Sequence, residues 1–482
     1  MDTKQAETSV GRGSGGAMSE QEDLWLRAAT PAEEYMEAAH QHGTCLTCYT
    51  LHLSSHNPLH QNTLTSALTH LYRKVGLLRV CLRLREGQLW LRQMEHCIID
   101  FKTVEGAGLE EVEEELTRGR YNTADGPLWC VRLLALPATQ PSTNQDPALC
   151  HRYALLFGVH HLLADGFTNS KICNVLHSIL DDVVAGRPVD DEVQFGRHLG
   201  NELLQKLYQE EERKLLEDPE LREKVTRSLA EGADCRPLLL DAFPASGTTD
   251  VKTSFVNTHF DKDMSQLFRQ KCKSERVSLH CGLVGVINAT FIALVKGRCQ
   301  LPPDLMFRAG HLVNIRRYYQ GDTSDILGNH VPLFGFRIAF KTSQDLMSNF
   351  WPTVREFHKQ FQSQLNDRYP LKNVALMLMN KSKSENIDEL FQSAETPDSY
   401  CTTSNMGDVT SMFTGVGECV KVTKLTRKAS IRAMNNFMCL YVHSLHGRLD
   451  VTIGFSTRFL DHNFAQAFMD TMNTTISTLC HA

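Results

Sequence analysis

The sequence predicts an α/β protein with two lobes, each a mixed sheet covered by helices. Three observations support this prediction. Strand-like and helix-like segments alternate over residues 24–190, and they alternate again over residues 251–482. Between these regions, residues 191–250 form a charged stretch that ends in a segment rich in turn-forming residues. We therefore expect a helical crossover and connector between the lobes, and a ligand site where the two lobes face each other.

Apolar runs predict the strands, and apolar residues three or four positions apart predict the helices. In the first lobe we expect a helix at 62–75 and strands at 46–53, 89–94 and 128–136. In the second lobe we expect a helix near 283–294 and strands near 311–315, 331–340 and 449–455. In the connector, helical spacing over 199–232 is interrupted by Pro219, which predicts two amphipathic helices whose charged residues face solvent.

Three further segments have the composition of irregular structure. Residues 1–23 contain four glycines among serine and threonine and lack an apolar stretch, so we expect a disordered tail rather than a targeting peptide. Residues 139–147 are rich in proline, threonine, asparagine and glutamine and should form a surface loop. Residues 233–250 read as a connector.

Composition restricts the class of protein. Lys and Arg number 50 and Asp and Glu number 56, a mildly acidic balance that gives no support for nucleic-acid binding. The longest apolar stretch, residues 281–295, is shorter than the roughly 20 residues that a membrane-spanning helix needs. The 15 cysteines are scattered, and Cys45 and Cys48 lie in a strand-like run with no second CxxC, so we expect packed cysteines rather than a disulfide framework or zinc site. These features predict a cytoplasmic protein without a transmembrane segment.

The most informative segment is residues 153–188. An apolar run of strand length, 153–159, is followed by HHLLADG, which comprises His160, His161, Asp165 and Gly166. Apolar residues at helical spacing then mark a helix that Thr168 or Asn169 could cap. The motif is therefore expected at a junction between a buried strand and a helix, where side chains are held rigidly at one end of a sheet.

The shorter pattern HxxxD occurs five times and carries little information alone. The pairs are His96/Asp100, His161/Asp165, His177/Asp181, His259/Asp263 and His446/Asp450. His177 and Asp181 are i, i+4 neighbours in the expected helix, and we interpret them as a pair on its surface. Only the pair at 161 and 165 has a preceding histidine, a following glycine and the strand–helix setting.

His161 has the chemistry of a general base, because an imidazole with a pKa near 6.5 can take a proton from an attacking alcohol or amine at neutral pH. Asp165 could orient the imidazole, or it could hold the loop, and Gly166 would permit a tight turn or close packing. Two other interpretations are that His160 and His161 are packed polar residues at a strand end, or that they form a His-His-Asp metal site. Adjacent histidines leave opposite faces of an extended chain, which argues against the metal.

The HHLLADG motif resembles the signature of the superfamily that contains chloramphenicol acetyltransferase, peptide-synthetase condensation domains and the HxxxD acyltransferases. Freestanding alcohol acetyltransferases and wax-ester synthases are the branches most similar in character. Weaker similarities follow in the order expected of that superfamily, and together they extend over residues 24–480. They are the segments 127–134 (PLWCVRLL), 313–316 (VNIR), 326–331 (ILGNHV) and 403–406 (TSNM).

The resemblance implies two CAT-like lobes with a substrate tunnel between them, and it implies roles for individual residues. His161 would be the catalytic base. Asp165 would point away from the reacting groups and form an ion pair with Arg316 of the other lobe, so it would be architectural rather than a triad member. Ser404 and Asn405 would bind substrate by donating hydrogen bonds near the oxyanion.

The implied function is transfer of an acyl group from a thioester, acyl-CoA in particular, to an alcohol or amine. Acyl-CoA would be a co-substrate, and no tightly bound cofactor or metal is implied. Both partners would be small molecules, and the protein would act as a monomer. The sequence lacks the DFGWG segment of the plant enzymes, and Asn314 replaces their usual aspartate. The alternative is an inactive CAT-like protein that binds acyl-CoA or a related ligand.

Overall fold

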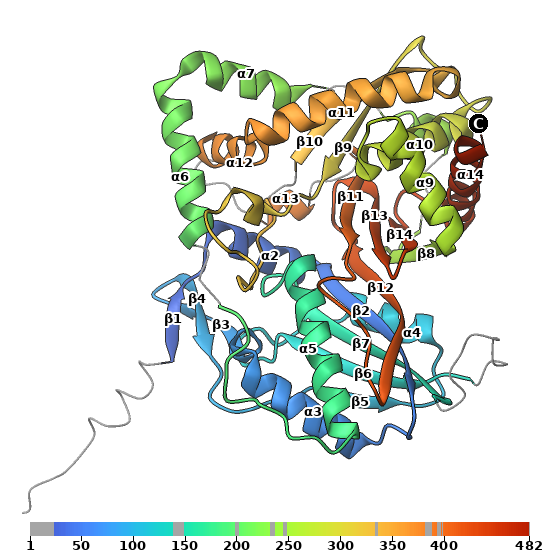
Figure 1. The fold of residues 1–482 in the computed structure, drawn as a ribbon. Coiled ribbons are helices and arrows are strands. Elements are labelled where there is room, and N and C mark those ends of the chain that lie inside the picture. The colour runs from blue at the N-terminus through green and yellow to red at the C-terminus, as the bar shows by residue number, and fades with distance from the viewer. Residues whose placement is uncertain are drawn as a thin grey trace, which may run out of the picture.

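The computed structural model describes residues 24–137, 149–197, 202–231, 237–243, 248–332, 336–380, 388–392, 397 and 399–481. The tail expected at 1–23 and the loop expected at 139–147 lie outside these residues. The described chain folds into two lobes, each with its own large sheet and apolar core (Figure 1). The α/β fold class with two sheet-and-helix lobes is thus confirmed.

The sheet of the first lobe has five strands. In spatial order they are β12 (Val420–Ile431), β2 (Thr44–Ser55), β7 (His151–His160), β6 (Trp129–Ala135) and β5 (Phe101–Val104). The middle strands are antiparallel, with Leu46 opposite His160. The helices of this lobe are α2 (Pro31–Gln41), α3 (Gln61–Lys74), α4 (Leu109–Arg118) and α5 (Gly166–Val184). A small separate sheet consists of β1 (Trp25–Ala28), β4 (Gln88–Gln93) and β3 (Val80–Arg85), and a short helix, η1 (Gly76–Arg79), directly precedes β3.

The sheet of the second lobe has six strands. Their order is β10 (Phe336–Ser343), β9 (Asp304–His311), β11 (Ser399–Asp408), β13 (Asn436–Leu445), β14 (Arg448–Ser456) and β8 (Thr253–His259). The longer helices of this lobe are α9 (Lys262–Ser274), α10 (Leu279–Val295), α11 (Phe350–Asn366), α12 (Tyr369–Asn380) and α14 (His462–His481). Shorter helices are η2 (Ile315–Tyr318), η3 (Leu346–Asn349) and α13 (Glu389–Gln392). In the sequence, the two lobes are separated by α6 (Glu202–Glu217), α7 (Pro219–Ala230) and α8 (Leu239–Ala242), and α6 and α7 pack against α12 of the second lobe (Figure 1).

Most predicted elements are present, including both connector helices on either side of the break at Pro219. Two strand predictions were displaced. The strand expected near 311–315 is β9, which ends at His311, and residues 315–318 form the helix η2 instead. The strand expected near 331–340 is β10, which begins at Phe336.

One strand of the first sheet comes from late in the chain. β12 lies in the sequence range expected for the second lobe, yet it pairs with β2 of the first lobe, with Thr426 opposite Thr50. In Figure 1, β12 (red) runs beside β2 (blue) and then returns to β13 in the other sheet. The two lobes therefore share a strand, which the sequence pattern did not indicate because periodicity identifies a strand but not its partner.

His177 and Asp181 hold the beginning of that shared strand. Both side chains are buried, so the prediction of a pair on the helix surface was wrong. The His177 Nε2 lies 2.8 Å from the carbonyl oxygen of Val420, and the Asp181 carboxylate accepts hydrogen bonds from the backbone N–H groups of Cys419 (2.7 Å) and Val420 (2.8 Å). The polar pair satisfies backbone groups at the end of β12, which explains why polar residues lie on the buried face of α5.

Among the described residues, no single helix combines the length and apolar content that crossing a bilayer requires. Only α9 and α10 together meet both criteria, and the pair is bent by 102° at its break.

Candidate active site

A cavity of about 1080 Å³, including the part that opens to solvent, lies between the two large sheets. Its walls come from both lobes. They include residues of the motif (His161, Asp165, Gly166, Phe167), of β2 (Cys45, Thr47, Tyr49), of β12 (Arg427 to Ile431), of β11 (Thr402, Ser404 to Met406) and of β13 (Cys439, Tyr441). The cavity thus brings His161, Ser404 and Asn405 together, although the last two are over 240 positions further along the chain.

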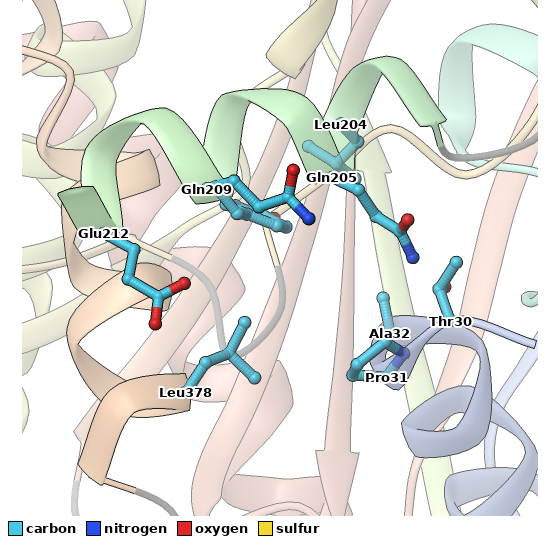
Figure 2. A pocket seen from close by; sticks show the side chains of 9 residues that line it. Thr30, Pro31, Ala32, Leu204, Gln205, Gln209, Glu212 and Leu378 are labelled. Carbon is cyan, nitrogen blue, oxygen red and sulfur yellow. The ribbon is translucent and has the colours of Figure 1, made fainter.

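A second pocket, of about 680 Å³, lies between α2 and α6. Figure 2 shows Gln205, Gln209 and Glu212 of α6 opposite Pro31 and Ala32, with Leu378 of α12 beside them. None of the motif residues reaches this pocket. Its lining offers no histidine, cysteine or serine, so the cavity at His161 is the better candidate for acyl-transfer chemistry.

His161 follows β7 directly and borders the cavity with a partly exposed side chain. The Asn329 side-chain amide nitrogen donates to the His161 carbonyl oxygen (3.0 Å) and lies 3.4 Å from the ring Nδ1. Burial lowers the pKa of His161 below its ordinary value, against the opposing effects of backbone carbonyls and of Asp165. The imidazole is therefore neutral at neutral pH, which is the form that a general base requires.

Asp165 does not serve as a hydrogen-bonded partner of His161. Its carboxylate accepts from Arg316 Nη1 (2.5 Å) and from the backbone N–H groups of His330 (2.9 Å) and Thr168 (2.9 Å). Asp165 and Arg316 therefore form the ion pair that the resemblance implies, and both side chains are buried. Burial by itself would raise the pKa of Asp165, but the Arg316 charge and the polar groups around it lower the pKa below its usual value.

The bond to Thr168 also corrects the prediction of the helix cap. Asp165, rather than Thr168 or Asn169, is the N-cap of α5. The Thr168 hydroxyl instead donates to the Gly328 carbonyl oxygen (2.8 Å), which lies in the segment 326–331 noted above. Gly328 O also accepts from Arg316 Nη2 (3.2 Å), so one turn of the second lobe locks the motif of the first.

Gly166 is required for close packing rather than for a special turn. A Cβ atom on Gly166 would lie 2.6 Å from the Met406 sulfur, and its φ angle is not positive. Met406 follows Ser404 and Asn405 on β11, so the absence of a Cβ on Gly166 lets the motif pack closely against this wall of the cavity.

His160 points to the other side of the chain from His161 and forms a cluster with Glu37 and His40. Its Nε2 lies 3.0 Å from Glu37 Oε2, and His40 Nδ1 lies 3.7 Å from the same oxygen. One potential metal-binding atom from each of the three side chains lies close enough to the others for all three to bind a single metal ion. However, each histidine already accepts a backbone N–H on its other nitrogen, from Leu162 to His160 and from Tyr121 to His40.

These backbone donors decide the chemistry of the cluster. A neutral imidazole that accepts on one nitrogen carries its proton on the other, so both rings present N–H to Glu37 rather than the lone pair that a metal needs. Burial alone would raise the pKa of Glu37, but its contacts with His160, Gln41 and His40 outweigh burial and lower it to about 2, while burial lowers the pKa of His40 to about 4. The cluster therefore fixes His160 and the strand end. Sequence reasoning missed Glu37 and His40 because they lie about 120 residues from the motif.

Ser404 and Asn405 lie on the cavity wall, as the resemblance implies, but part of their hydrogen-bonding capacity is used. The Asn405 side-chain oxygen accepts from the Gly407 N–H (2.8 Å), and the Ser404 carbonyl oxygen accepts from Arg427 Nη2 (3.2 Å). The Ser404 hydroxyl and the Asn405 amide NH₂ are the groups that could donate to a developing oxyanion.

Two thiols also border the cavity, from Cys45 and Cys439. Burial raises the pKa of each thiol to about 12, so both are protonated at neutral pH. A protonated thiol is a poor nucleophile, so these pKa values give no support for an acyl-cysteine intermediate. Cys48 of the CxxC is buried on the opposite face of β2, as expected of a packed residue.

No family model matches the chain, and no curated protein matches it as a relative. Solved structures do match. The trichothecene 15-O-acetyltransferase from Fusarium sporotrichioides has a TM-score of 0.65 at 12% identity, covering 95% of this chain and 98% of the other. The first condensation domain of the CDA synthetase has a TM-score of 0.65 at 12% identity, with coverage of 94% and 96%.

The epimerization domain from the third module of tyrocidine synthetase B is similar to the same degree, with a TM-score of 0.64 at 12% identity and coverage of 95% and 97%. These structures extend over nearly the whole of both chains, so the similarity includes both lobes and the shared connection. At 12% identity the comparison shows similarity of fold alone. The fold implied by the HHLLADG resemblance is confirmed: the chain has the two-lobed fold of condensation domains and of the trichothecene acetyltransferase.

Proposed function

We propose that the chain is an acyltransferase that moves an acyl group from acyl-CoA to an alcohol or amine, with His161 as general base. One observation carries the proposal. A neutral imidazole lies in a cavity between two lobes, and a buried ion pair and an asparagine hold the loop that bears it. Supporting this, condensation domains and the trichothecene 15-O-acetyltransferase share the fold.

The reaction would proceed in two steps at one site. His161 takes the proton of the acceptor's hydroxyl or amine as that oxygen or nitrogen attacks the thioester carbonyl carbon. The new C–O or C–N bond gives a tetrahedral oxyanion, towards which Ser404 and Asn405 donate. Collapse breaks the C–S bond, and the thiolate of CoA takes the proton back from His161. The products are an ester or amide and free CoA.

In this proposal acyl-CoA is a co-substrate, and no tightly bound cofactor or metal takes part in the step. The enzyme would work as a cytoplasmic monomer on small molecules. Both of these properties remain predictions.

The test is release of free CoA, measured with a thiol reagent, from a panel of acyl-CoA donors and pooled alcohols and amines. The expected result is release that depends on an acceptor and falls by about 10²–10⁴-fold in His161→Ala, the usual contribution of a general base. His96→Ala is the matched control, because His96 also begins an HxxxD pattern but is exposed and does not line the cavity. Equal release by wild type and His161→Ala would contradict the assignment.

The alternative is an inactive protein that binds acyl-CoA. It is favoured if the wild-type chain binds acyl-CoA in equilibrium measurements but releases no CoA with any donor and acceptor pair.

A further inference from the structure

Arg427 is a buried cation on the cavity wall, and its surroundings differ from those of the other charged residues there. It lies on β12, and its side chain is almost fully buried, with 3% of the residue exposed. Its Nη1 would lie 3.5 Å from a Cβ atom on Gly166, so the guanidinium is beside the motif rather than at a distant part of the cavity. Lysine and arginine are seldom buried to this degree unless they are paired.

The other charged side chains that border the cavity have ion-pair partners. Asp165 pairs with Arg316, and Lys428 pairs with Glu113 at 2.5 Å. Arg427, in contrast, forms an ion pair with no carboxylate in the part of the chain that the structure describes. A buried charge that lacks a counter-charge is costly, and removing water from it raises that cost.

The groups that do contact Arg427 are neutral. Its Nη2 donates to the carbonyl oxygens of Val442 (2.7 Å) and Ser404 (3.2 Å), and its Nε lies 3.5 Å from His443 Nδ1. Burial, with the Arg427 charge as the next contribution, holds the pKa of His443 well below its usual range, so that ring is neutral. Tyr49, whose pKa burial raises to about 12, is a further neighbour. Neutral groups therefore surround the positive charge, and no carboxylate among the described residues balances it.

We propose that Arg427 binds a carboxylate carried by one of the two substrates, so that the cavity selects an anionic acyl group or an anionic acceptor. The inference rests on the proposed function for the identity of the two substrates. A guanidinium matches a carboxylate geometrically and forms charge-assisted hydrogen bonds with it. Because Arg427 and His161 border the same cavity, a substrate whose carboxylate binds Arg427 also lies in the cavity that His161 lines, and the carboxylate supplies the missing counter-charge.

The experiment measures binding without turnover. The His161→Ala protein is titrated with two matched pairs of probes, of which one member carries a carboxylate. On the donor side the pair is succinyl-CoA and butyryl-CoA. Both carry the CoA phosphates, so the contribution of the phosphates to binding is the same for the two probes. On the acceptor side the pair is 4-hydroxybutyrate and butan-1-ol. Each titration is repeated with double variants that carry Arg427→Met, Arg427→Lys or Arg432→Met in addition to His161→Ala. Arg432 is an exposed cation just after β12 and serves as the control.

The expected result is that one pair shows at least about tenfold tighter binding of the carboxylate member, and this pair identifies the substrate that carries it. Arg427→Met removes the preference, and Arg432→Met leaves it unchanged. Arg427→Lys keeps the positive charge and retains part of the preference, which covers the case in which Arg427→Met fails to fold. Equal binding within both pairs, a preference that persists in Arg427→Met, or no binding of any probe overturns the proposal.

Failure of this test differs from failure of the proposed function. Binding that ignores the carboxylate, together with His161-dependent release of CoA by the wild type, removes the anion site and leaves the acyltransferase. Carboxylate-selective binding that depends on Arg427, without release of CoA, removes the enzyme and leaves a binding protein.

Discussion

The ion pair between Asp165 and Arg316 gives the most direct test of how the motif is held. Both side chains are nearly inaccessible, with 2% and 3% exposed, and their closest atoms are 2.5 Å apart. Asp165→Asn removes the negative charge but keeps an oxygen that can accept from the Thr168 N–H, so the helix cap survives. The other oxygen becomes an NH₂ group that faces two donors, Arg316 Nη1 and the His330 backbone N–H, so the loss measures the broken contacts of that oxygen rather than the loss of a cap.

Breaking a buried pair in this way costs about 3–5 kcal/mol. The lower end of that range applies here, because Arg316 keeps neutral acceptors in the carbonyl oxygens of Ile326 (2.9 Å) and Gly328 (3.2 Å) and in the Thr168 hydroxyl (2.9 Å). We therefore expect the free energy of unfolding to fall by about 3 kcal/mol, measured by urea unfolding followed by circular dichroism and tryptophan fluorescence.

The matched control is Glu217→Gln, which also converts a carboxylate to an amide. Glu217 pairs with Arg213 at 2.7 Å, but the side chains are 60% and 63% exposed, so the expected loss is about 0.3–0.5 kcal/mol. A loss of similar size in both variants would refute the argument that burial makes the Asp165 charge important.

The pH dependence of the difference follows from the pKa of Asp165. Its pKa is lower in the folded protein than in the unfolded chain, where it is about 3.9. Stability from this group is therefore fully present above the unfolded pKa and is lost as pH falls through the folded value. The difference in free energy of unfolding between the wild type and Asp165→Asn should be constant near neutral pH and should decrease only in acid.

Two further predictions concern the motif. Because burial lowers the pKa of His161, its neutral base form persists below the ordinary pKa of histidine. We therefore expect kcat/KM to fall only at a pH below about 6.5, which a pH–rate profile checks. An inflection at or above that pH would contradict a lowered pKa. Gly166→Ala would place a Cβ 2.6 Å from the Met406 sulfur, and we expect it to lower the free energy of unfolding by about 1–3 kcal/mol and to reduce activity. Adding Met406→Ala to that variant should recover part of the stability in unfolding experiments and part of the activity in the thiol-release assay. If neither recovers, the strain lies elsewhere.

The sequence indicated the motif and its setting well. HHLLADG could be placed at a strand–helix junction because its flanks are a continuous apolar run and a helical stripe, both of which are local patterns. The partner of Asp165 was accessible only through the resemblance, since Arg316 is 151 positions away. Local pattern also misled at the helix start, because Asp165 could be seen as a catalytic or loop residue but not as the N-cap that it is.

What could not be predicted depends on which segments meet in space. His177 and Asp181 have the spacing of a surface pair, yet β12 covers them, and nothing local shows that a strand some 240 residues away begins there. Arg427 escaped attention for the same reason. In the sequence it is one of several cations in a strand with Lys424 and Lys428. Only the packing of β12 between two lobes shows that its charge meets no carboxylate among the residues that the structure describes.

Because β12 belongs to the sheet of the first lobe, that lobe cannot complete its sheet until late in the synthesis of the chain. Until residue 431 has left the ribosome, β2 presents a twelve-residue edge of unpaired N–H and C=O groups. The first lobe, although it occupies the beginning of the chain, therefore cannot finish folding early in synthesis. For the same reason, cutting the chain near residue 250 should yield an amino-terminal fragment that aggregates along this edge rather than a stable half-enzyme.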